Sequence, residues 1–252
     1  MKSTFIYSML GVAVLALLAF SITDEFVIKI TPNNTLSAKE RREGFKLLFD
    51  GKSLENFRNY KKQTISKDWI IDDEAIYLNA QTLKQGQWHS EGGDIITKEK
   101  FSNFELKIDC KISPCANSGL IWNVQELDSL DQTWYTGPEM QILDDTCYHG
   151  SRDDKHRSGD LYDLISSGKQ PNKNIGEWNH IVLRQKNGFV EQFQNGEKLV
   201  SVQIGSDAWN KLVAGSKFKN MPYFGKFKEG HIAIQDHGYK IWFRNIKIRS
   251  LD

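Results

Sequence analysis

The sequence predicts an all-β domain folded as a two-sheet sandwich of the jelly-roll type, and three observations support this prediction. Residues 104–112 alternate apolar and polar side chains almost strictly, which is typical of a strand with one solvated face. Residues 178–199 hold two Asn-Gly pairs, at 187–188 and 195–196, and this dipeptide favours tight hairpin turns because it tolerates positive φ angles. Helical periodicity is scarce, and only residues 206–214 predict a short helix. Many short strands separated by turns are typical of sandwiches.

Two further strands are expected at the C-terminal end, over residues 231–235 and 240–248, with His237 and Gly238 between them. A jelly roll brings the ends of the domain together, so we expect the last strand to lie beside the first, at residues 47–49. The inward side chains of the last strand would then pack in the core; they are Trp242 or Phe243, with Ile246 and Ile248.

The 252 residues are expected to hold one folded domain, over residues 44–252, after an N-terminal targeting segment. Residues 1–22 combine a positive start at Lys2, an uncharged apolar run and small residues near Ser21, which is the pattern of a signal peptide. The run is short for a membrane span of ~20 residues, and an uncleaved anchor is the alternative. Residues 23–43 are expected to form a polar tether. We therefore expect an exported protein of the periplasm or cell surface.

Charge and composition exclude one class of partner and favour another. The 33 basic and 32 acidic residues give a net charge of +1, so the basic excess that draws a protein to nucleic acid is absent. Aromatic residues make up 12% of the chain, and aromatic faces stack on sugar rings, although a sandwich core also consumes such residues. We expect a small carbohydrate as partner, no nucleic acid, and no membrane contact beyond an N-terminal anchor.

The three cysteines, Cys110, Cys115 and Cys147, give no disulfide framework because their number is odd. Cys110 and Cys115 could pair only if the chain turned at Pro114, so three free, partly buried thiols are expected. No spacing of Cys and His is typical of zinc. We expect no cofactor, with calcium as the alternative, because four Asp residues could gather Ca²⁺ but lack the regular spacing of a calcium loop; they are Asp144, Asp145, Asp153 and Asp154.

One acidic strand carries the clearest chemical signal. On a regular strand Glu139 and Gln141 share one face, and a β-bulge at residues 142–143 would bring Asp144 to that face as well. Two carboxylates on one concave surface suit glycoside cleavage, in which one group donates a proton and the other takes charge or activates water. A similar acidic pattern on a bulged strand occurs in laminarinase-type glycosidases. The alternative is an edge strand with a solvated face that ends in an Asp-rich turn.

Two further clusters could contribute to the same site. Gln235 ends a predicted strand, and Asp236 and His237 occupy the following turn, where an Asp can orient a His that exchanges protons near neutral pH. The alternative is that Asp236 caps its own turn. The loop after the acidic strand adds groups that bind sugar hydroxyls or move protons, unless it is simply an exposed charged loop; they are His149, Arg157 and Tyr162.

Seven short segments, in order along residues 44–250, form the most specific pattern. Residues 44–54 follow GF-x-x-LF-[DN]-GK-x-L, and residues 139–144 follow E-[YF]-Q-[IV]-L-D with Met140 at the aromatic position. The final segment, residues 230–245, contains GHIAIQDHG and FRNI. With these segments the chain resembles the 3-keto-disaccharide hydrolase domain family. The remaining segments are 93–106, 117–120, 159–165, and 176–179 with 195–196.

The resemblance implies a concanavalin A-like jelly roll and action on sugars already oxidised to a ketone at carbon 3. Such a ketone makes the C2 proton acidic, so a base can remove it, the C1 substituent leaves, and water addition completes a net hydrolysis. The catalytic groups implied by matching positions are Glu139, Asp144, His149 and His237. Contacts to sugar hydroxyls would come from Gln141, Arg157, Tyr162, Gln235 and Asp236.

We therefore predict a glycoside-cleaving hydrolase, and the alternative is a non-catalytic carbohydrate-binding module on the same fold. A binding module needs an aromatic platform, whereas an enzyme needs its acidic groups together in one concave site. A site that gathers Glu139, Asp144 and His237 would favour the enzyme.

Overall fold

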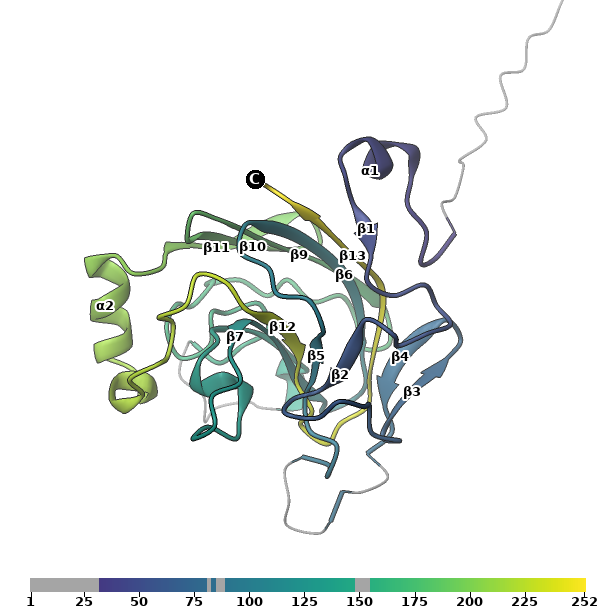
Figure 1. Ribbon diagram of the computed structural model, residues 1–252, viewed down its shortest axis with the longest axis horizontal. Helices are drawn as coiled ribbons and strands as arrows, with labels where there is room; N and C mark the ends of the chain where they lie inside the picture. Colours follow the sequence, from purple (N-terminus) through teal and green to yellow (C-terminus); the bar gives the residue numbers. More distant parts are fainter. Residues whose placement is uncertain (1–31, 81–82, 85–88, 148–154) are drawn as a thin grey trace, which may run out of the picture. The chain divides into compact units, whose positions relative to one another are not determined.

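The computed structural model describes residues 32–80, 83–84, 89–147 and 155–252, and these form two antiparallel β-sheets packed as a sandwich (Figure 1). The predicted all-β sandwich is therefore confirmed. The expected signal peptide or anchor, residues 1–22, lies outside the described residues. Within the described ranges, no helix has the length and apolar character needed to cross a membrane.

The larger sheet has eight strands in the order β11-β10-β9-β6-β13-β4-β3, and β1 pairs with β13 beside this path. The first and last strands are neighbours, as expected, because Lys46 lies opposite Ile248 and Leu47 opposite Lys247. The strands of this sheet are β1 (Lys46–Leu47), β3 (Trp69–Asp72), β4 (Ala75–Leu78), β6 (Phe104–Ile112), β9 (Trp178–Lys186), β10 (Phe189–Gln194), β11 (Glu197–Gln203) and β13 (Ile241–Ser250).

The smaller sheet has five strands in the order β2-β5-β12-β7-β8. Its edge strand β8 is covered by the segment after it, since the N–H of Gly159 donates to the carbonyl of Gln141 and the N–H of Tyr162 to that of Glu139. The strands are β2 (Phe57–Asn59), β5 (Ile95–Thr97), β7 (Asn117–Val124), β8 (Glu139–Leu143) and β12 (His231–Ile234).

Helices are few and short in the described part of the chain. The longest, α2, begins after Ser206, whose hydroxyl accepts a hydrogen bond from the N–H of Trp209 at 3.1 Å, and it buries Trp209. This helix confirms the one expected over residues 206–214. The helices are α1 (Ala38–Arg42), α2 (Asp207–Ala214) and the 3₁₀ turns η1 (Thr133–Tyr135), η2 (Asp145–Cys147) and η3 (Lys217–Asn220).

The strands predicted from alternation and turns lie where the sequence places them. β6 coincides with residues 104–112, and β9, β10 and β11 are separated by turns in which Asn187 and Asn195 have φ angles of 52° and 51°. The expected core residues of the last strand are at most 2% exposed; they are Phe243, Ile246 and Ile248.

Alternation along the strands divides the side chains of the smaller sheet into two sets. One set packs between the sheets and includes Leu120, Trp122, Met140 and Ile142. The other set points away from the larger sheet, on a side that we call the outer face. At one end of the outer face a separate apolar cluster is buried; it consists of Tyr60, Ile96, Ile121, Val124 and Ala233.

Part of the expected polar tether is folded onto the larger sheet. Asn34 exchanges two hydrogen bonds with Asn245 of β13, at 2.6 and 2.8 Å. Glu40, in the helix α1 near β1 and β13 (Figure 1), accepts hydrogen bonds from Lys107 and Lys247 at 3.1 and 3.0 Å. The polar composition of this segment therefore reflects pairing with the sheet, and the folded unit begins before residue 44.

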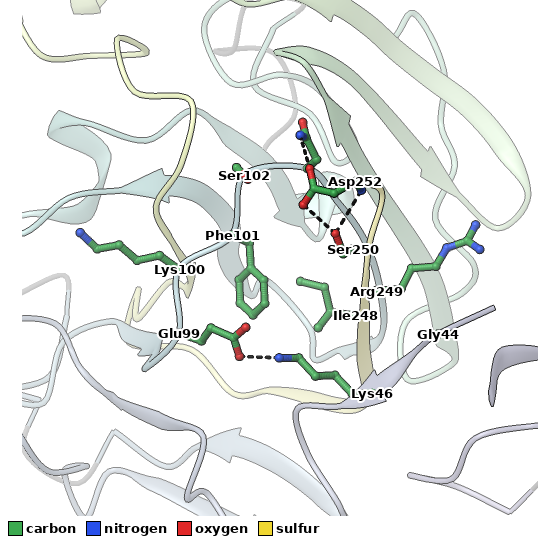
Figure 2. A pocket seen from close by; sticks show the side chains of 11 residues that line it. Gly44, Lys46, Glu99, Lys100, Phe101, Ser102, Ile248, Arg249, Ser250 and Asp252 are labelled. Atoms are coloured by element: carbon green, nitrogen blue, oxygen red, sulfur yellow. Dashed lines mark hydrogen bonds and ion pairs between the residues drawn. The ribbon is translucent and has the colours of Figure 1, made fainter. Parts of the chain in front are cut away.

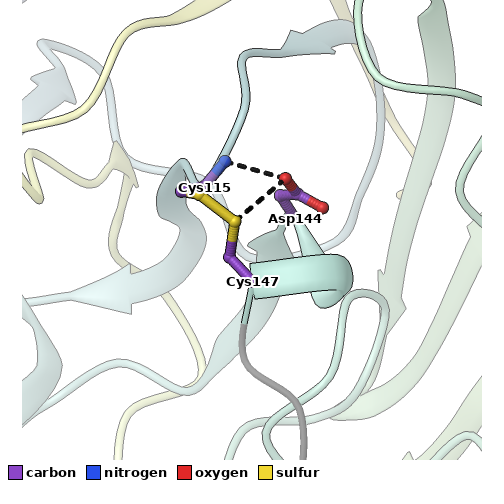
Figure 3. Close-up of side chains that lie close together, drawn as sticks. All are labelled: Cys115, Asp144 and Cys147. Carbon is purple, nitrogen blue, oxygen red and sulfur yellow. Dashed lines mark hydrogen bonds between the residues drawn. A yellow bond between two sulfur atoms is a disulfide. The ribbon is translucent and has the colours of Figure 1, made fainter.

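The expectation of three free thiols is wrong, because Cys115 and Cys147 form a disulfide (Figure 3). The two residues are 32 positions apart, and the chain brings them together where the N–H of Asp144 donates to the carbonyl of Ala116 at 2.9 Å. Cys110 is a free thiol buried in β6. The pairing depends on how the end of β8 returns to the turn before β7, which sequence spacing does not show.

Candidate active site

Glu139 and Gln141 share the outer face of the smaller sheet, as alternation predicts. β8 pairs with β7 in one unbroken register, with Ile121 opposite Glu139 and Gly119 opposite Gln141. The residue between them, Met140, is fully buried in the core between the sheets. The two polar side chains therefore point away from that core.

The carboxyl group of Glu139 lies against Gly119 of β7. A Cβ atom at position 119 would lie 2.0 Å from Oε1 and 2.6 Å from Cδ of Glu139, so only glycine leaves room for the carboxyl group. Gly119 is held on its other side, because its carbonyl accepts a hydrogen bond from the N–H of Gln235 at 2.9 Å. The glycine of the Asn-Ser-Gly segment thus sets the place of the acid between β8 and the end of β12.

Glu139 is a buried acid without a fixed partner among the residues that the structure describes. Its side chain is 6% exposed, and within the described part of the chain it forms no hydrogen bond or ion pair. Burial raises the pKa of Glu139 to about 8; the charge of Lys217 opposes this shift and that of Asp94 adds to it. A carboxyl group that titrates near neutral pH can take up and release a proton under ordinary conditions.

A second buried acid, Asp94, precedes β5 and acts on Glu139 through its charge. Its Oδ1 accepts a hydrogen bond from the N–H of Asp236 at 2.8 Å, and its Oδ2 accepts the hydroxyl of Thr133. Burial raises the pKa of Asp94 to about 6, while these two hydrogen bonds lower it. Asp94 therefore ties together η1, β5 and the turn after β12 around the site.

Lys217, an exposed residue, supplies a positive charge that acts on Glu139. Its Nζ lies 4.0 Å from the ring centre of Tyr162 and 5.8 Å from that of Trp134. Its backbone N–H is anchored on Asp163 Oδ2 at 2.7 Å. An ammonium group placed near a reacting carboxyl can stabilise negative charge that develops on a bound substrate.

Side-chain amides surround the acid on the outer face. Gln141 Nε2 donates to Asn117 Oδ1 at 2.6 Å, and both residues are buried. The side-chain amide of Gln235 is 7% exposed and makes no hydrogen bond within the residues that the structure describes. Amides of this kind donate and accept, so they suit the hydroxyl groups of a sugar.

The apolar end of the outer face is closed by the chain between β7 and β8. Tyr60 donates its hydroxyl to the carbonyl of Gln125 at 3.1 Å, and Arg58 holds Glu126 through two hydrogen bonds of 2.7 and 2.6 Å. Trp134 packs against the apolar cluster beneath. The loop thus keeps water from one side of the site, which strengthens electrostatic interactions there.

The β-bulge expected at residues 142–143 is absent, because the register with β7 continues unbroken to Leu143. A strand rises about 3.3 Å per residue, so the Cα atoms of Glu139 and Asp144 are roughly 16 Å apart. Paired glycosidase carboxyl groups stand about 5–9.5 Å apart. Glu139 and Asp144 therefore lie too far apart along the strand for the expected pair.

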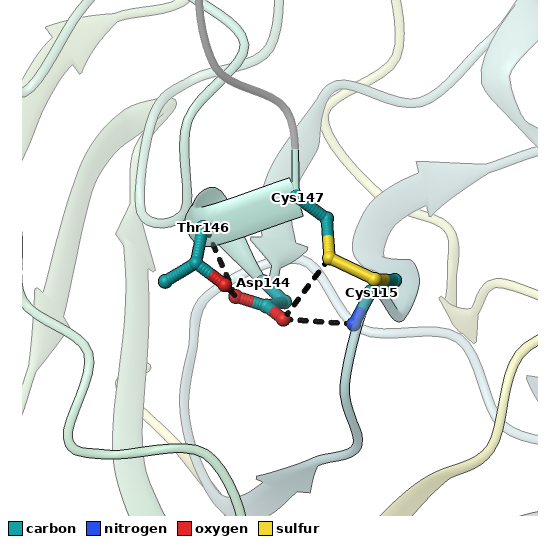
Figure 4. Close-up of a disulfide and its surroundings, with 4 residues drawn as sticks. All are labelled: Cys115, Asp144, Thr146 and Cys147. Carbon is teal, nitrogen blue, oxygen red and sulfur yellow. Dashed lines mark hydrogen bonds between the residues drawn. A yellow bond between two sulfur atoms is a disulfide. The ribbon is translucent and has the colours of Figure 1, made fainter.

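Asp144 instead holds the disulfide loop (Figure 4). Its Oδ2 accepts the N–H of Cys115 at 2.7 Å, and its Oδ1 accepts the N–H and the hydroxyl of Thr146 at 2.9 and 2.6 Å. Asp144 and the two cysteines are the single cluster of three metal-binding side chains in the described residues, and the sulfur atoms of that cluster are joined to each other.

The turn after β12 places Asp236 and His237 differently from the expectation. Asp236 is fully buried, and its Oδ1 accepts the N–H of Gly238 at 2.9 Å, which confirms the alternative that it caps its own turn. Its Oδ2 accepts the N–H of Ser90 at 2.9 Å. His237 is half-buried, two residues beyond Gln235, and its ring centre lies 6.1 Å from that of Tyr239.

The loop predicted to bind sugar hydroxyls is only partly described. Tyr162 lies beside β8, half-buried under Lys217, with its ring 4.6 Å from that of His156. Arg157 is exposed, and its N–H donates to Asp160 at 2.8 Å. His149 lies outside the described residues.

A pocket of about 310 Å³ lies elsewhere, at the junction of β1, β13 and residues 99–103 (Figure 2). Lys46 pairs with Glu99 across it, and Arg249 donates to Glu105 at 2.7 Å. Its charged groups largely neutralise one another, and it contains none of the residues around Glu139.

Sequence reasoning missed Asp94, Asn117 and Lys217. Asp94 and Asn117 belong to segments 93–106 and 117–120, which carry the family resemblance. Each is a polar residue next to an apolar strand, and this signal could have identified them. Nothing local marks Lys217, which reaches the site only because η3 packs beside Tyr162 and Trp134.

Comparisons with known proteins identify the family of the chain. A family model described as a 3-keto-alpha-glucoside-1,2-lyase-like domain matches residues 44–249. The chain is 31% identical to a 3-keto-disaccharide hydrolase of Bacteroides thetaiotaomicron, over 89% of this chain and 84% of that protein. The chain therefore belongs to the 3-keto-alpha-glucoside-1,2-lyase-like domain family, and the predicted resemblance is confirmed.

Solved structures support the same class. A protein of Parabacteroides distasonis named a "putative glycosyl hydrolase" shares 32% identity and a TM-score of 0.79, over 88% of this chain and all of that one. A second protein of the same name and organism shares 28% identity and a TM-score of 0.60, over 82% of this chain and 99% of that one. Fold and family together define a carbohydrate-active domain of the 3-keto-disaccharide hydrolase type.

Proposed function

We propose that this domain hydrolyses 3-keto-glycosides, with Glu139 as the base that removes the proton next to the ketone. The observation that carries the proposal is the state of Glu139: buried against Gly119, without a partner in the described residues, and with a pKa of about 8. The name of the related Bacteroides protein supplies the substrate class.

The reaction runs in two halves. The carboxylate of Glu139 accepts the proton from C2, and the electron pair moves into an enolate on the C3 oxygen. The enolate then collapses, the bond from C1 to the glycosidic oxygen breaks, and the leaving alcohol takes a proton. Water adds to C1 of the resulting enone, and the carboxyl group of Glu139, whose proton has by then exchanged with solvent, donates a proton to C2. The balance is one water consumed for each glycosidic bond broken.

The neighbouring residues supply the remaining roles. Lys217 balances the negative charge that moves from Glu139 to the enolate. Gln141, held by Asn117, and Gln235 bind sugar hydroxyls. His237 is the proposed proton donor to the leaving alcohol, because it follows Gln235, whose N–H is bonded to Gly119 beside the acid.

The test is cleavage of 3-keto-trehalose or 3-keto-lactose by the purified chain in D₂O, with the unoxidised disaccharides as controls. Elimination and hydration predict cleavage of only the keto sugars, with deuterium at C2 of the keto product from the earliest time points. The isolated product, incubated with enzyme-free buffer, corrects for spontaneous exchange. Cleavage with no deuterium at C2 would contradict the elimination route. Binding of keto sugars without any turnover would favour the carbohydrate-binding module instead.

We also propose that the protein works outside the cytoplasm. The Cys115–Cys147 disulfide supports this, because such bonds persist mainly in oxidising compartments. The residues 1–22 support it through their signal-peptide pattern. N-terminal sequencing of the mature protein tests the proposal, and an intact Met1 on protein recovered from the cytoplasm would contradict it.

A further inference from the structure

The outer side of the larger sheet carries a row of aromatic residues that the proposed reaction does not use. In register across five neighbouring strands, from β3 through β4, β13 and β6 to β9, Ile70 faces Tyr77, Tyr77 faces Trp242, Trp242 faces Lys111 and Lys111 faces Trp178. The side chains on either side of Tyr77, Trp242 and Lys111 along their strands belong to the core, so these residues point away from the other sheet. Trp178 lies opposite Lys111 and shares its face. We call Tyr77, Trp242, Lys111 and Trp178 the aromatic strip.

Tyr77 is buried at 8% exposed, and the accessible part of the strip is Trp242, Lys111 and Trp178. Trp178 and Trp242 are both partly exposed, and neither indole N–H donates a hydrogen bond within the described residues. The backbone positions of the two tryptophans are two strand spacings apart, which is about 10 Å. That separation is close to the length of two linked pyranose rings, so the two tryptophans could support alternate rings of one sugar chain.

Positive charges accompany the rings. Nζ of Lys111 lies 4.5 Å from the ring centre of Trp242 and 5.1 Å from that of Trp178. Nζ of Lys240 lies 4.8 Å from Trp242 and 4.2 Å from Tyr77. Neither lysine forms an ion pair with any acid in the described ranges, so their charges have only the rings as partners.

The nearest acidic group in register does not neutralise these lysines. Asp109, one row away on β6, already accepts hydrogen bonds from His180 and Asn245, both at 2.7 Å. Arg244 lies with its guanidinium 3.9 Å from the ring centre of Trp178 and its Nε 3.9 Å from Asp109 Oδ2, so the unpaired positive charge of the strip comes from Lys111 and Lys240. The strip is therefore an aromatic platform with a net positive charge.

We propose that the aromatic strip binds a polysaccharide that carries carboxylate groups, independently of the site around Glu139. Trp242 and Trp178 would stack on alternate sugar rings, as aromatic faces do on apolar sugar faces. Lys111 and Lys240 would leave the rings and pair with carboxylates of the polymer. Such a surface would hold the domain on an acidic glycan while the opposite sheet acts on small keto sugars.

The experiment measures the affinity of the full chain for polygalacturonate by affinity electrophoresis and calorimetry, with neutral galactan and dextran sulfate as comparison polymers. Wild type should bind polygalacturonate and not galactan, and binding should weaken with salt. Trp178→Ala and Trp242→Ala should each lower the affinity roughly tenfold, which corresponds to the loss of one stacked ring. Lys111→Gln and Lys240→Gln should lower it roughly two- to fivefold, the range of a single exposed charge pair.

Matched controls lie on the same sheet. Phe189→Ala removes an exposed aromatic residue of β10, and Lys186→Gln removes an exposed cation at the far end of the strand that carries Trp178. Both should leave the affinity unchanged. Trp178→Phe and Trp242→Phe keep a ring and should retain most of the binding, which guards against a fold defect in the alanine variants. Cleavage of a small 3-keto-glycoside should be the same in all of these variants, so this test stands apart from the proposed reaction.

Four results would overturn the inference. They are no binding of polygalacturonate, equal binding of galactan, tighter binding of dextran sulfate, and affinity that depends on the lysines while the tryptophan variants bind as wild type does.

Discussion

Glu139 begins β8, and Asp144 follows its last residue. The sequence predicted that these two acids act as a pair, but their surroundings in the structure are opposite. Glu139 and Asp144 are both almost fully buried, at 6% and 1% exposed. The oxygens of Asp144 accept hydrogen bonds from Cys115 and Thr146, whereas those of Glu139 accept none within the described residues. Burial alone therefore does not identify a reactive carboxyl group.

The difference has an energetic meaning. A buried carboxylate with its hydrogen bonds made stabilises the fold around it, as Asp144 does at the disulfide. A buried acid without partners makes its charged form costly and shifts its pKa towards neutrality, as in Glu139. Proteins retain such costly groups mainly where function requires them. The hydrogen bonds that a buried acid makes therefore distinguish a structural carboxyl group from a reactive one, whereas its burial does not.

The largest expected effect tests this separation directly. Glu139→Gln keeps size and hydrogen-bonding capacity but cannot move a proton, so kcat on a 3-keto-glycoside should fall roughly 10²- to 10⁴-fold. KM should change little, because the amide can still contact hydroxyl groups. Asp144→Asn is the matched variant, and per folded molecule it should keep nearly full activity. Steady-state kinetics on both variants decides; equal rates for wild type and Glu139→Gln would remove Glu139 from the mechanism.

A smaller loss of activity is expected when the carboxyl group of Glu139 is displaced but still able to transfer a proton. In Gly119→Ala the new methyl group would meet Oε1 at 2.0 Å, so the carboxyl group must move. A displacement of about 1 Å at a reacting group can cost on the order of 10²-fold in rate. Kinetics with Gly215→Ala as the control should isolate the effect, because a Cβ atom there would meet only ordinary contacts of 3.5 and 3.7 Å. Unchanged activity in folded Gly119→Ala would show that the contact with Gly119 does not position the acid.

Local patterns predicted most of the fold. The alternation at residues 104–112 and the Asn-Gly turns located β6 and the hairpins of β9 to β11, because these signals depend on neighbouring residues alone. Alternation also placed Glu139 and Gln141 on one face correctly. The bulge assumed for Asp144 was an extra step that no local residue required, and the regular register shows that the strand continues without it.

The rest of the site depends on contacts between distant segments. The bond of Asp94 to Asp236 spans 142 positions, and the disulfide spans 32. Lys217 arrives from a 3₁₀ turn, with its Nζ near the rings of Tyr162 and Trp134. No window along the sequence contains such pairs, so their partners become visible only once the strand order is known.

A stability measurement also tests the difference between Asp144 and Glu139. Asp144→Asn exchanges a charged acceptor for an amide whose NH₂ group cannot accept the bonds from Cys115 or Thr146, so the free energy of unfolding should fall by about 1–3 kcal/mol. Glu139→Gln breaks no hydrogen bond in the described residues and should unfold at the same or a higher urea concentration. Urea denaturation of the oxidised protein, followed by tryptophan fluorescence, compares the two. Equal destabilisation of both variants would contradict the structural role of Asp144.

The smallest expected effect is a shift in the pH dependence of kcat/KM when Asp94 is substituted. If Glu139 acts as a base, kcat/KM of the wild type should rise with pH, reach half its plateau near pH 8 and level off above it, as the acid ionises. Asp94 raises the pKa of Glu139 through its negative charge, so removing that charge lowers this pKa. Asp94→Asn should therefore move the rising limb to lower pH, while the amide keeps an acceptor for the N–H of Asp236. Asp128→Asn, an exposed acid in the loop between β7 and β8, should leave the profile unchanged. A shift of the Asp94→Asn profile to higher pH would contradict the effect of the Asp94 charge, and a limb that falls with rising pH in the wild type would instead make Glu139 the proton donor.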